Sequence, residues 1–238
     1  MSRFHSLKVE NIKRLSPSSV QISFEIPAEL KDNFKFKAGQ YLSFKHELSG
    51  HELRRDYSIC SSPTEDKLQI GVKQVEDGFF SVFANQELKE GDMLQVMEPH
   101  GRFIYDNITD NNTNKVAIAA GSGITPVLSI IKHSLTNEKD SKFLLIYGNR
   151  TQEETMFLDD IKALETAYPE RFYVEFVFSQ EQVGDYRFGR IDRSIINFFL
   201  KNKYKETKQD LFFICGPGDL IEQTKETLLA NEISENKI

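Results

Sequence analysis

Hydrophobic and polar positions follow two different rhythms along this chain of 238 residues. Over residues 1–108, short segments alternate apolar and polar positions, with glycine, proline and polar clusters between them. Because successive side chains of a strand point to opposite faces, this alternation predicts strands with one buried face. The predicted strands are residues 6–11, 20–26, 41–45, 56–61, 68–74 and 93–98. Such regular short strands predict a small antiparallel β-barrel or sandwich, with one helix over residues 79–86.

From Lys115 onward, compact apolar runs alternate with segments of helical periodicity. The apolar runs, predicted as strands, are residues 116–120, 143–147, 172–178 and 211–215. The segments that follow them, predicted as helices, begin after Pro126 and cover residues 153–167, 194–200 and 220–230. Strand–helix alternation predicts βαβ units and a parallel sheet. We therefore expect an antiparallel β-barrel domain over residues 1–108 and an α/β parallel-sheet domain over residues 114–238, joined by the polar linker 106–114.

Composition and charge argue against several classes of function. The net charge is −6 and no basic stripe is present, which disfavours a nucleic-acid partner. No apolar run approaches the roughly 18 residues of a membrane span, and the first residues lack the apolar core of a signal peptide. The five histidines show no metal-ligand spacing. Cys60 and Cys215 are interpreted as free thiols of a reducing compartment, so we expect a cytoplasmic protein without a metal site in this chain.

The segment Val116–Ile131 is the most informative, because a buried strand runs into Gly121-Ser122-Gly123 and then into a helix. Glycines let the backbone approach a bound group, and a helix N-terminus offers N–H donors and partial positive charge to a phosphate. The pattern departs from the full dinucleotide fingerprint, since Pro126 stands where the third glycine belongs. It predicts the phosphate site of a dinucleotide, with an ordinary strand–turn–helix connection as the alternative.

Other strand ends add polar groups at the carboxyl edge of the predicted sheet, where open parallel sheets bind ligands. Asn149 and Arg150 follow the second strand, at the place where the adenosine ribose of a dinucleotide usually lies. A guanidinium there suits the 2′-phosphate of NADP, and a solvated surface arginine is the alternative. The fourth strand ends in Cys215-Gly216-Pro217, a second glycine turn that leaves room for a flat ring.

Three motifs together resemble the ferredoxin–NADP reductase superfamily, in order and in spacing over nearly the whole chain. They are the flavin motif Arg55-Asp56-Tyr57-Ser58, the helix-start motif Gly78-Phe79-Phe80-Ser81 and the nicotinamide motif Cys215-Gly216-Pro217. The resemblance implies an FAD-binding barrel, an NADP-binding α/β domain and transfer of a hydride from NADPH to the flavin. The class of enzyme that it implies is an NAD(P)H-dependent flavin oxidoreductase.

The resemblance also implies roles for single residues of the barrel half. Arg55 is expected to pair with the FAD pyrophosphate, where a planar guanidinium can form two bonds. Tyr57 is expected to lie on the isoalloxazine ring and Ser58 to bond near the flavin atom that receives the hydride. Residues 78–81 are expected to offer backbone N–H groups and a hydroxyl to the pyrophosphate. For Tyr57 the alternative is half-buried packing in a strand.

In the α/β half, the resemblance places Cys215 beside the nicotinamide, which it is expected to position rather than attack. Burial of a strand-end thiol is the alternative. Thr125 is expected near the flavin and Arg190 near the NADP phosphates. The superfamily often has Ser-Arg after the third strand, whereas Ser179 is followed here by Gln180. One phosphate contact is therefore missing, so NADPH is expected while strict preference over NADH stays open.

Longer stretches, among them ELRRDYSIC and AIAAGSGITP, resemble the reductase components of aromatic-CoA oxygenases in phenylacetate degradation. Such reductases continue into a plant-type ferredoxin domain, whose 2Fe–2S cluster needs a set of spaced cysteines that is not found here. The resemblance implies that electrons from NADPH pass through FAD to an iron–sulfur centre and then to an oxygenase component. We expect a truncated form without the last strand of its sheet, with a natural short form that hands electrons to a separate carrier as the alternative. A 2Fe–2S cluster is expected only in a full-length form.

Two other functions remain open on the sequence. The first is a free-standing ferredoxin, flavodoxin or flavin reductase, which would share the same FAD and NADP motifs. The second is a non-catalytic electron-relay subunit of a larger complex, which would bind FAD without oxidising NADPH itself.

Overall fold

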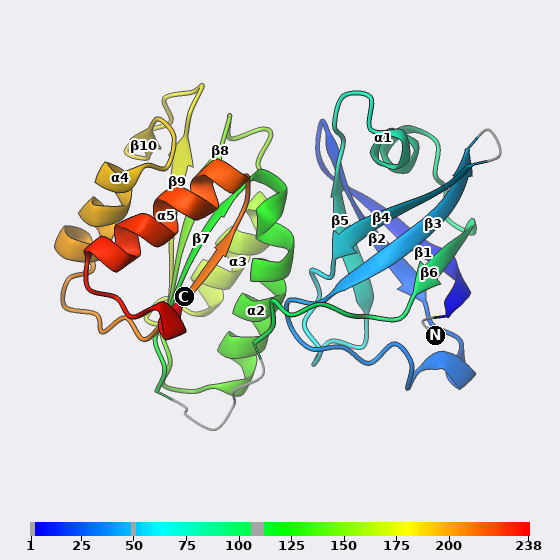
Figure 1. Cartoon of the computed structure of the whole chain (residues 1–238), viewed down its shortest axis with the longest axis horizontal. Coiled ribbons are helices and arrows are strands. Elements are labelled where there is room, and N and C mark those ends of the chain that lie inside the picture. The colour runs from blue at the N-terminus through cyan, green and yellow to red at the C-terminus, as the bar shows by residue number, and fades with distance from the viewer. Residues whose placement is uncertain (1–2, 49–50, 106–111) are drawn as a thin grey trace. The chain divides into compact units, whose positions relative to one another are not determined.

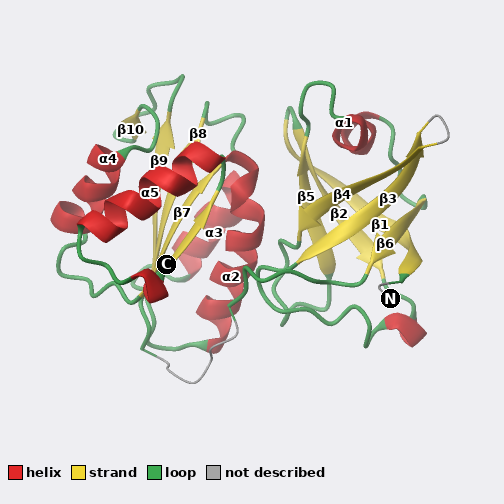
Figure 2. Ribbon diagram, in the orientation of Figure 1, coloured by secondary structure: helices red, strands yellow, loops and turns green. Residues whose placement is uncertain are grey.

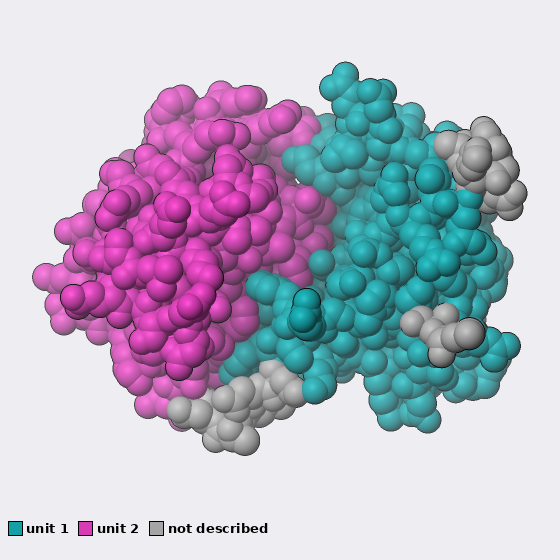
Figure 3. All heavy atoms as spheres, viewed as in Figure 1, with its two compact units in different colours: residues 1–106, 128–133 teal, residues 107–127, 134–238 magenta. Residues whose placement is uncertain are grey.

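The computed structural model describes residues 3–48, 51–105 and 112–238 (Figure 1, Figure 2). The chain forms two compact units, coloured separately in Figure 3. Unit 1 comprises residues 1–106 and 128–133, and unit 2 comprises residues 107–127 and 134–238. Most of the predicted linker, residues 106–111, lies outside the described residues.

Two findings hold for the described part of the chain. None of its helices combines the length and the apolar character that crossing a membrane requires. No group of three or more His, Cys, Asp or Glu side chains there is arranged to hold a metal ion.

Unit 1 is built on a six-stranded antiparallel sheet. Its strands are β1 (Phe4–Ser16), β2 (Ser19–Glu25), β3 (Tyr41–Leu48), β4 (His51–Ser58), β5 (Leu68–Lys73) and β6 (Met93–Met97). They lie in the order β4-β3-β6-β1-β2-β5. Just beyond β4, an isolated bridge pairs Ile59 with Ile70 of β5, and the Cys60 N–H donates to the Gln69 carbonyl at 2.8 Å. The two edge strands therefore meet, and the predicted antiparallel barrel is confirmed.

The core of unit 1 lies on the inner face of this curled sheet. Helix α1 (Phe79–Gln86) begins after Gly78, has the predicted bounds and buries Phe80 and Ala84. A short helical turn, η1 (Ala28–Leu30), lies between β2 and β3. The fully buried core side chains of the strands include Leu7, Ile22, Leu42, Ile70, Val72 and Val96.

Strand β4 corrects the sequence prediction, which placed a strand at residues 56–61. The strand covers His51–Ser58 and pairs with β3 from end to end. Residues 52–56 carry four charged side chains and therefore lack the apolar alternation that identifies strands. Those charges are compatible with β4 because it is the edge strand of the sheet, where charged side chains are common. Strand β1 likewise extends beyond its predicted residues 6–11.

Unit 2 contains a five-stranded sheet. Its strands are β7 (Lys115–Ala120), β8 (Phe143–Asn149), β9 (Phe172–Phe178), β10 (Arg187–Phe188) and β11 (Leu211–Cys215). They lie in the order β10-β9-β8-β7-β11, and every neighbouring pair is parallel. The predicted α/β parallel sheet is confirmed, although β10 is too short to have been recognised from its sequence pattern.

Helices connect the strands of this sheet. They are η2 (Gly121–Gly123), α2 (Ile124–Asn137), α3 (Leu158–Ala167), α4 (Arg193–Phe198), the π-helical turn η3 (Phe199–Lys203), α5 (Gly218–Ala230) and η4 (Glu235–Lys237). Side chains of α4 and α5 pack with Val116, Ile118, Leu144 and Ile146 of the sheet. Figure 2 shows α3 on the opposite face of the sheet from α5.

Helix α3 begins later than predicted, at Leu158 rather than at residue 153. Phe157 stands just before it in the left-handed conformation, with φ of 59°. Because left-handed backbone is costly for a bulky residue, burial has to stabilise it. Met156 and Phe157 are indeed buried, so tertiary packing overrides the helical periodicity of this segment.

Candidate functional site

Arg55 lies at the rim of a hollow on unit 1 that we call the Arg55 hollow. Its lining residues are Phe44, His46, Leu53, Arg55, Phe79 and Phe80. The guanidinium is exposed, and one of its nitrogens donates to the Arg54 carbonyl at 2.7 Å. The hollow therefore brings together a cation from β4 and the first residues of α1, which come from the two sequence motifs predicted to act on one ligand.

The start of α1 is shaped by a tight contact. A Cβ atom at Gly78 would lie 2.3 Å from the Val75 side chain and 2.4 Å from the Ser81 hydroxyl. That hydroxyl donates to the Gly78 carbonyl at 2.9 Å and accepts from the Val75 N–H at 3.2 Å. Ser81 thus closes the turn with its own hydrogen bonds. What the motif offers to an anion is the first-turn backbone N–H groups, which have no partner inside a helix.

Tyr57 packs at the edge of the unit 1 core. Its ring centroid lies 5.2 Å from that of Phe80 and 6.0 Å from that of Phe44. Burial raises the pKa of Tyr57 to about 12, against the opposing effect of the Arg55 charge. The phenol is therefore neutral at physiological pH, and its partly exposed ring can support a flat ligand.

Asp56 and Ser58 point to the other face of β4, because successive residues of a strand alternate. Asp56 accepts a hydrogen bond from the Ser43 hydroxyl, its partner on β3. The same Ser43 oxygen lies 3.2 Å from His100 Nε2, and His100 Nδ1 lies 2.8 Å from the Glu98 carbonyl. The flavin motif is thus divided, with Arg55 and Tyr57 on one face and Asp56 within a polar chain on the other.

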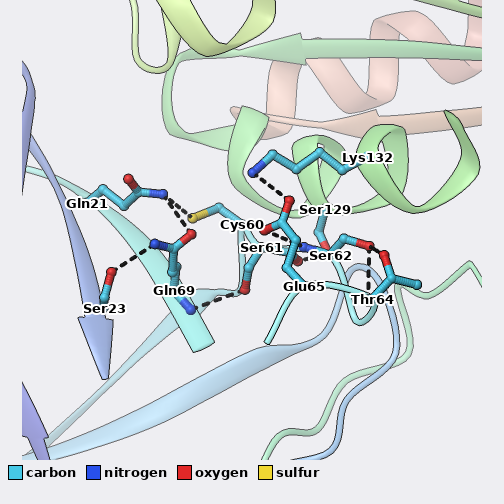
Figure 4. A network of polar contacts seen from close by, with 10 residues as sticks. All are labelled: Gln21, Ser23, Cys60, Ser61, Ser62, Thr64, Glu65, Gln69, Ser129 and Lys132. Carbon is cyan, nitrogen blue, oxygen red and sulfur yellow. Dashed lines mark hydrogen bonds and ion pairs between the residues drawn. The ribbon is translucent and has the colours of Figure 1, made fainter. Parts of the chain in front are cut away.

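Cys60 belongs to a buried polar network of unit 1 (Figure 4). Gln21 Nε2 lies 3.7 Å from its sulfur and 3.2 Å from Gln69 Oε1. Burial raises the pKa of the Cys60 thiol to about 12. Next to it, the Ser61 carbonyl accepts from the Ser129 hydroxyl at 2.6 Å. Cys60 therefore acts in packing and is unsuited to nucleophilic chemistry.

In unit 2, the two glycines of the Gly121–Gly123 turn have different surroundings. Gly121 has φ of +53°, and nothing lies within 4 Å of the position a Cβ would take. At Gly123 a Cβ would lie 2.2 Å from the Cys215 carbonyl oxygen. Gly123 therefore permits η2 to approach the end of β11, whereas Gly121 leaves open space of the kind that a phosphate needs.

Tyr147 holds this turn, although no sequence motif singled it out. Its hydroxyl donates to the Gly121 carbonyl at 2.9 Å, while its ring is fully buried. Burial raises the pKa of Tyr147 far above its usual range, so the hydroxyl remains a donor. A tyrosine two residues before the end of a buried strand was the only signal available. Thr125 adds a second restraint, since its buried hydroxyl donates to the Ser122 carbonyl at 2.9 Å.

The Cys215-Gly216-Pro217 motif links β11 to α5. Cys215 is partly exposed, and burial raises its pKa to about 11. Its thiol is therefore protonated at neutral pH and a poor nucleophile, which suits a positioning role. A Cβ at Gly216 would lie 2.9 Å from the terminal methyl of Leu220 and 3.3 Å from the Ala120 nitrogen, so the turn into the helix that Pro217 precedes leaves little room for a side chain.

The carboxyl end of β8 carries the most direct indication of a ligand site. Asn149 is 8% exposed, and neither polar atom of its side chain has a partner in good hydrogen-bond geometry, although the amide lies close enough to the Tyr147 hydroxyl to oppose the rise in the pKa of that phenol. A buried amide without a partner is costly, and a ligand that supplies one removes that cost. Arg150 follows on the surface, exposed. An unpaired amide beside an exposed guanidinium fits a polar, anionic ligand such as the ribose phosphate of a dinucleotide.

Arg190 lies on the surface of unit 2, close to the start of α5. Its guanidinium lies 3.9 Å from the Asp219 carboxylate, and both side chains are mostly exposed. Ion pairs of this kind contribute little to stability, so the arginine can turn toward an anionic ligand at small cost.

Comparison with known proteins gives the same two-part division. The family described as oxidoreductase FAD-binding domain matches residues 6–105, and the family described as oxidoreductase NAD-binding domain matches residues 117–226. A subunit of the 1,2-phenylacetyl-CoA epoxidase of Escherichia coli is 39% identical over 97% of the chain. The chain spans 65% of the length of that relative.

Solved structures share the fold. The CS-b5R domains of human Ncb5or superpose with a TM-score of 0.87 and 23% identity, covering 100% of this chain and 69% of that one. A ferredoxin NADP+ reductase from Neisseria gonorrhoeae with bound FAD and NADP superposes with a TM-score of 0.81 and 23% identity. That match covers 97% of this chain and 92% of the reductase chain. Motifs and relatives agree that the chain consists of an oxidoreductase FAD-binding domain followed by an oxidoreductase NAD-binding domain, and its fold is that of the ferredoxin NADP+ reductase above.

Proposed function

We propose that the chain is an FAD-dependent oxidoreductase that takes electrons from NADPH, with FAD bound by residues 1–108 and the nucleotide by residues 114–238. The observation that carries the proposal is the Arg55 hollow, where a guanidinium and the first turn of α1 meet. Both groups bind anions, and the expected anion is the pyrophosphate of FAD. The Gly121–Gly123 turn and the unpaired Asn149 amide support the same conclusion for a dinucleotide on unit 2.

The chain's own residues divide the work between binding and orientation. Arg55 and the N–H groups of residues 79–81 hold the pyrophosphate, and Tyr57 supports the flat ring of the flavin. Ser58 is the last residue of β4, and its bond to the edge of that ring has to be made from the strand end, because its side chain starts on the other face of the strand. Bound FAD supplies the chemistry, accepting a hydride and releasing electrons one at a time. The protein's task is to fix the orientation of that ring, because rate depends on near-attack geometry.

On unit 2 the residues bind and orient the nucleotide. The open backbone at Gly121 receives its phosphates, with Arg190 as a further cation. Arg150 pairs with the 2′-phosphate and Asn149 gains the partner that it lacks. Cys215, held as a neutral thiol, sets the position of the nicotinamide. None of these roles requires a covalent bond to the protein.

For the electron acceptor we propose a ferredoxin-type iron–sulfur centre that serves an oxygenase acting on an aromatic CoA ester. The support is the name of the relative that is 39% identical, which belongs to an epoxidase for phenylacetyl-CoA. A plant-type 2Fe–2S cluster is held by four cysteines, and residues 1–238 contain two. The proposed iron–sulfur centre is therefore supplied from outside these residues. Two free thiols agree with a cytoplasmic location.

A first experiment tests the FAD and NADPH claims together. The purified chain is expected to be yellow, to release about one FAD per chain on acid precipitation, and to reduce ferricyanide with NADPH. A protein that stays colourless after mixing with FAD contradicts the proposal. A yellow protein that leaves NADPH unoxidised is instead an electron-relay subunit.

A second experiment tests the acceptor. We expect NADPH-dependent reduction of an added plant-type ferredoxin domain, followed by coupled oxygenase turnover only when that domain is present. Equal oxygenase turnover without the domain contradicts the proposed relay. Direct and rapid reduction of free flavin, with none of ferredoxin, would identify a free-standing flavin reductase.

A further inference from the structure

Three contacts tie the ends of β8 and β9 together in unit 2. The Ser179 N–H donates to the Asn149 carbonyl at 3.0 Å, and the Gln180 N–H donates to the Arg150 carbonyl at 2.9 Å. The third contact comes from a side chain, because Glu181 Oε2 accepts from the Gln152 N–H at 2.8 Å. Glu181 thus lies against the loop that carries Arg150, although it is 31 residues away in sequence.

This arrangement places a carboxylate and a guanidinium at the same strand-end loop. Glu181 is exposed and bonds to the backbone two residues beyond Arg150. A 2′-phosphate near Arg150 would carry close to two negative charges and would be repelled by the carboxylate. A free ribose hydroxyl, in contrast, can donate a hydrogen bond to a carboxylate, which is how NAD enzymes usually hold it. The two side chains therefore favour different nucleotides.

We propose that Glu181 is a specificity-determining residue that opposes Arg150, so that the site accepts NADH as well as NADPH. The inference rests on the proposed function, since it requires that a nicotinamide dinucleotide binds unit 2 with its adenosine ribose at Arg150. The residues directly after β9 agree with this, because Ser179, Gln180 and Glu181 bring one negative and no positive charge to the loop.

The alternative is that Glu181 is only a structural latch for the loop. Substitution to glutamine separates the two roles, because an amide oxygen can still accept from the Gln152 N–H while the charge is gone. A latch alone predicts that Glu181→Gln leaves nucleotide discrimination unchanged. Glu170→Gln is the matched control, since Glu170 is an exposed carboxylate just before the opposite end of β9.

The experiment measures binding of two fragments to the FAD-loaded protein by titration calorimetry at low salt. The fragments are 2′,5′-ADP, which carries the 2′-phosphate, and ADP, which has a free 2′-hydroxyl. Glu181→Gln is expected to tighten 2′,5′-ADP binding roughly two- to fivefold, the small effect of removing an exposed charge, and to leave ADP binding unchanged or weaker. Glu170→Gln should change neither. Arg150→Ala should shift the ratio the opposite way, by roughly tenfold through weaker 2′,5′-ADP binding.

The possible outcomes separate the inference from the proposed function. If neither fragment binds the wild-type protein, nucleotide binding by unit 2 is wrong. If both bind and Arg150→Ala shifts the ratio but Glu181→Gln does not, Glu181 is a latch and the inference is overturned. A gain for Glu181→Gln that shrinks at high salt supports the charge effect, because exposed charges are screened.

Discussion

Arg54 and Arg55 are neighbours in sequence with different surroundings. Arg54 pairs with the Glu52 carboxylate at 2.7 Å and lies over the Phe4 ring, whereas Arg55 faces the hollow beside α1. We predict that Arg55→Ala weakens FAD binding by roughly 1.5–3 kcal/mol, the loss of hydrogen bonds to a charged group. FAD retained after gel filtration measures this, with Arg54→Ala as the control that keeps its flavin. Equal loss from both variants would show that general positive charge, rather than Arg55, holds the cofactor.

A second prediction at this scale concerns the pH dependence of stability. Burial raises the pKa of Cys60 to about 12. The unfolded chain ionises this thiol near pH 8.5, so it loses a proton that the folded state keeps. The protonated Cys60 thiol therefore stabilises the folded state at low pH, and this contribution to the free energy of unfolding is lost as the pH rises from about 8.5 toward about 12. Between pH 7.5 and 10.5, the free energy of unfolding in urea should fall by roughly 2.7 kcal/mol less for Cys60→Ala than for the wild type. Parallel losses would mean that the thiol ionises freely in the folded protein.

At the scale of elements, the contact between η2 and β11 makes a sharp prediction. A methyl group at Gly123 would lie 2.2 Å from the Cys215 carbonyl, and neither backbone can move without disturbing the sheet. Gly123→Ala should therefore destabilise unit 2 by about 1–3 kcal/mol or more, as overpacking does. Gly218→Ala is the control, because nothing lies within 4 Å of its Cβ position at the start of α5. Urea unfolding measures the stability of both variants. If Gly123→Ala is as stable as Gly218→Ala, η2 lies farther from β11 than the structure shows.

The elements also show how far the sequence alone could reach. Helix α1 has its predicted bounds because Gly78 and the apolar spacing of the helix give the same answer. Strand β4 was misplaced because its pairing with β3, rather than its composition, makes it a strand. The predicted start of α3 at residue 153 was wrong because the buried Phe157 adopts the left-handed backbone conformation, which interrupts the helix before Leu158. The motif residues can be located in the sequence alone and their roles stay predictions, whereas the Glu181 contact and the hydrogen bond from Tyr147 to Gly121 depend on which strand ends are neighbours.

On the whole-molecule scale, each unit contains one cysteine, and these two thiols are natural reporters. Ligand that binds only the folded state of a unit suppresses its opening by a factor set by concentration over Kd. We predict that FAD at 100 times its Kd slows alkylation of Cys60 roughly 100-fold in Cys215→Ser protein. In Cys60→Ala protein, 2′,5′-ADP should protect Cys215 much less, because this partly exposed thiol can react without the opening of unit 2. Mass spectrometry follows both rates, and equal protection of both thiols by either ligand would show that the chain opens as one unit.

The strand order of unit 2 has a consequence for synthesis of the protein. In the finished sheet, strand β7 lies between β8 and β11, but β11 begins only at Leu211, far along the chain. At about 5–20 residues per second, a ribosome needs roughly 5–20 s to make the intervening stretch of about 90 residues. Throughout that interval one edge of the apolar strand β7 has no neighbour, in a segment whose side chains are finally buried. During synthesis the nascent chain therefore passes through an interval in which that edge of β7 is open to pairing with other chains.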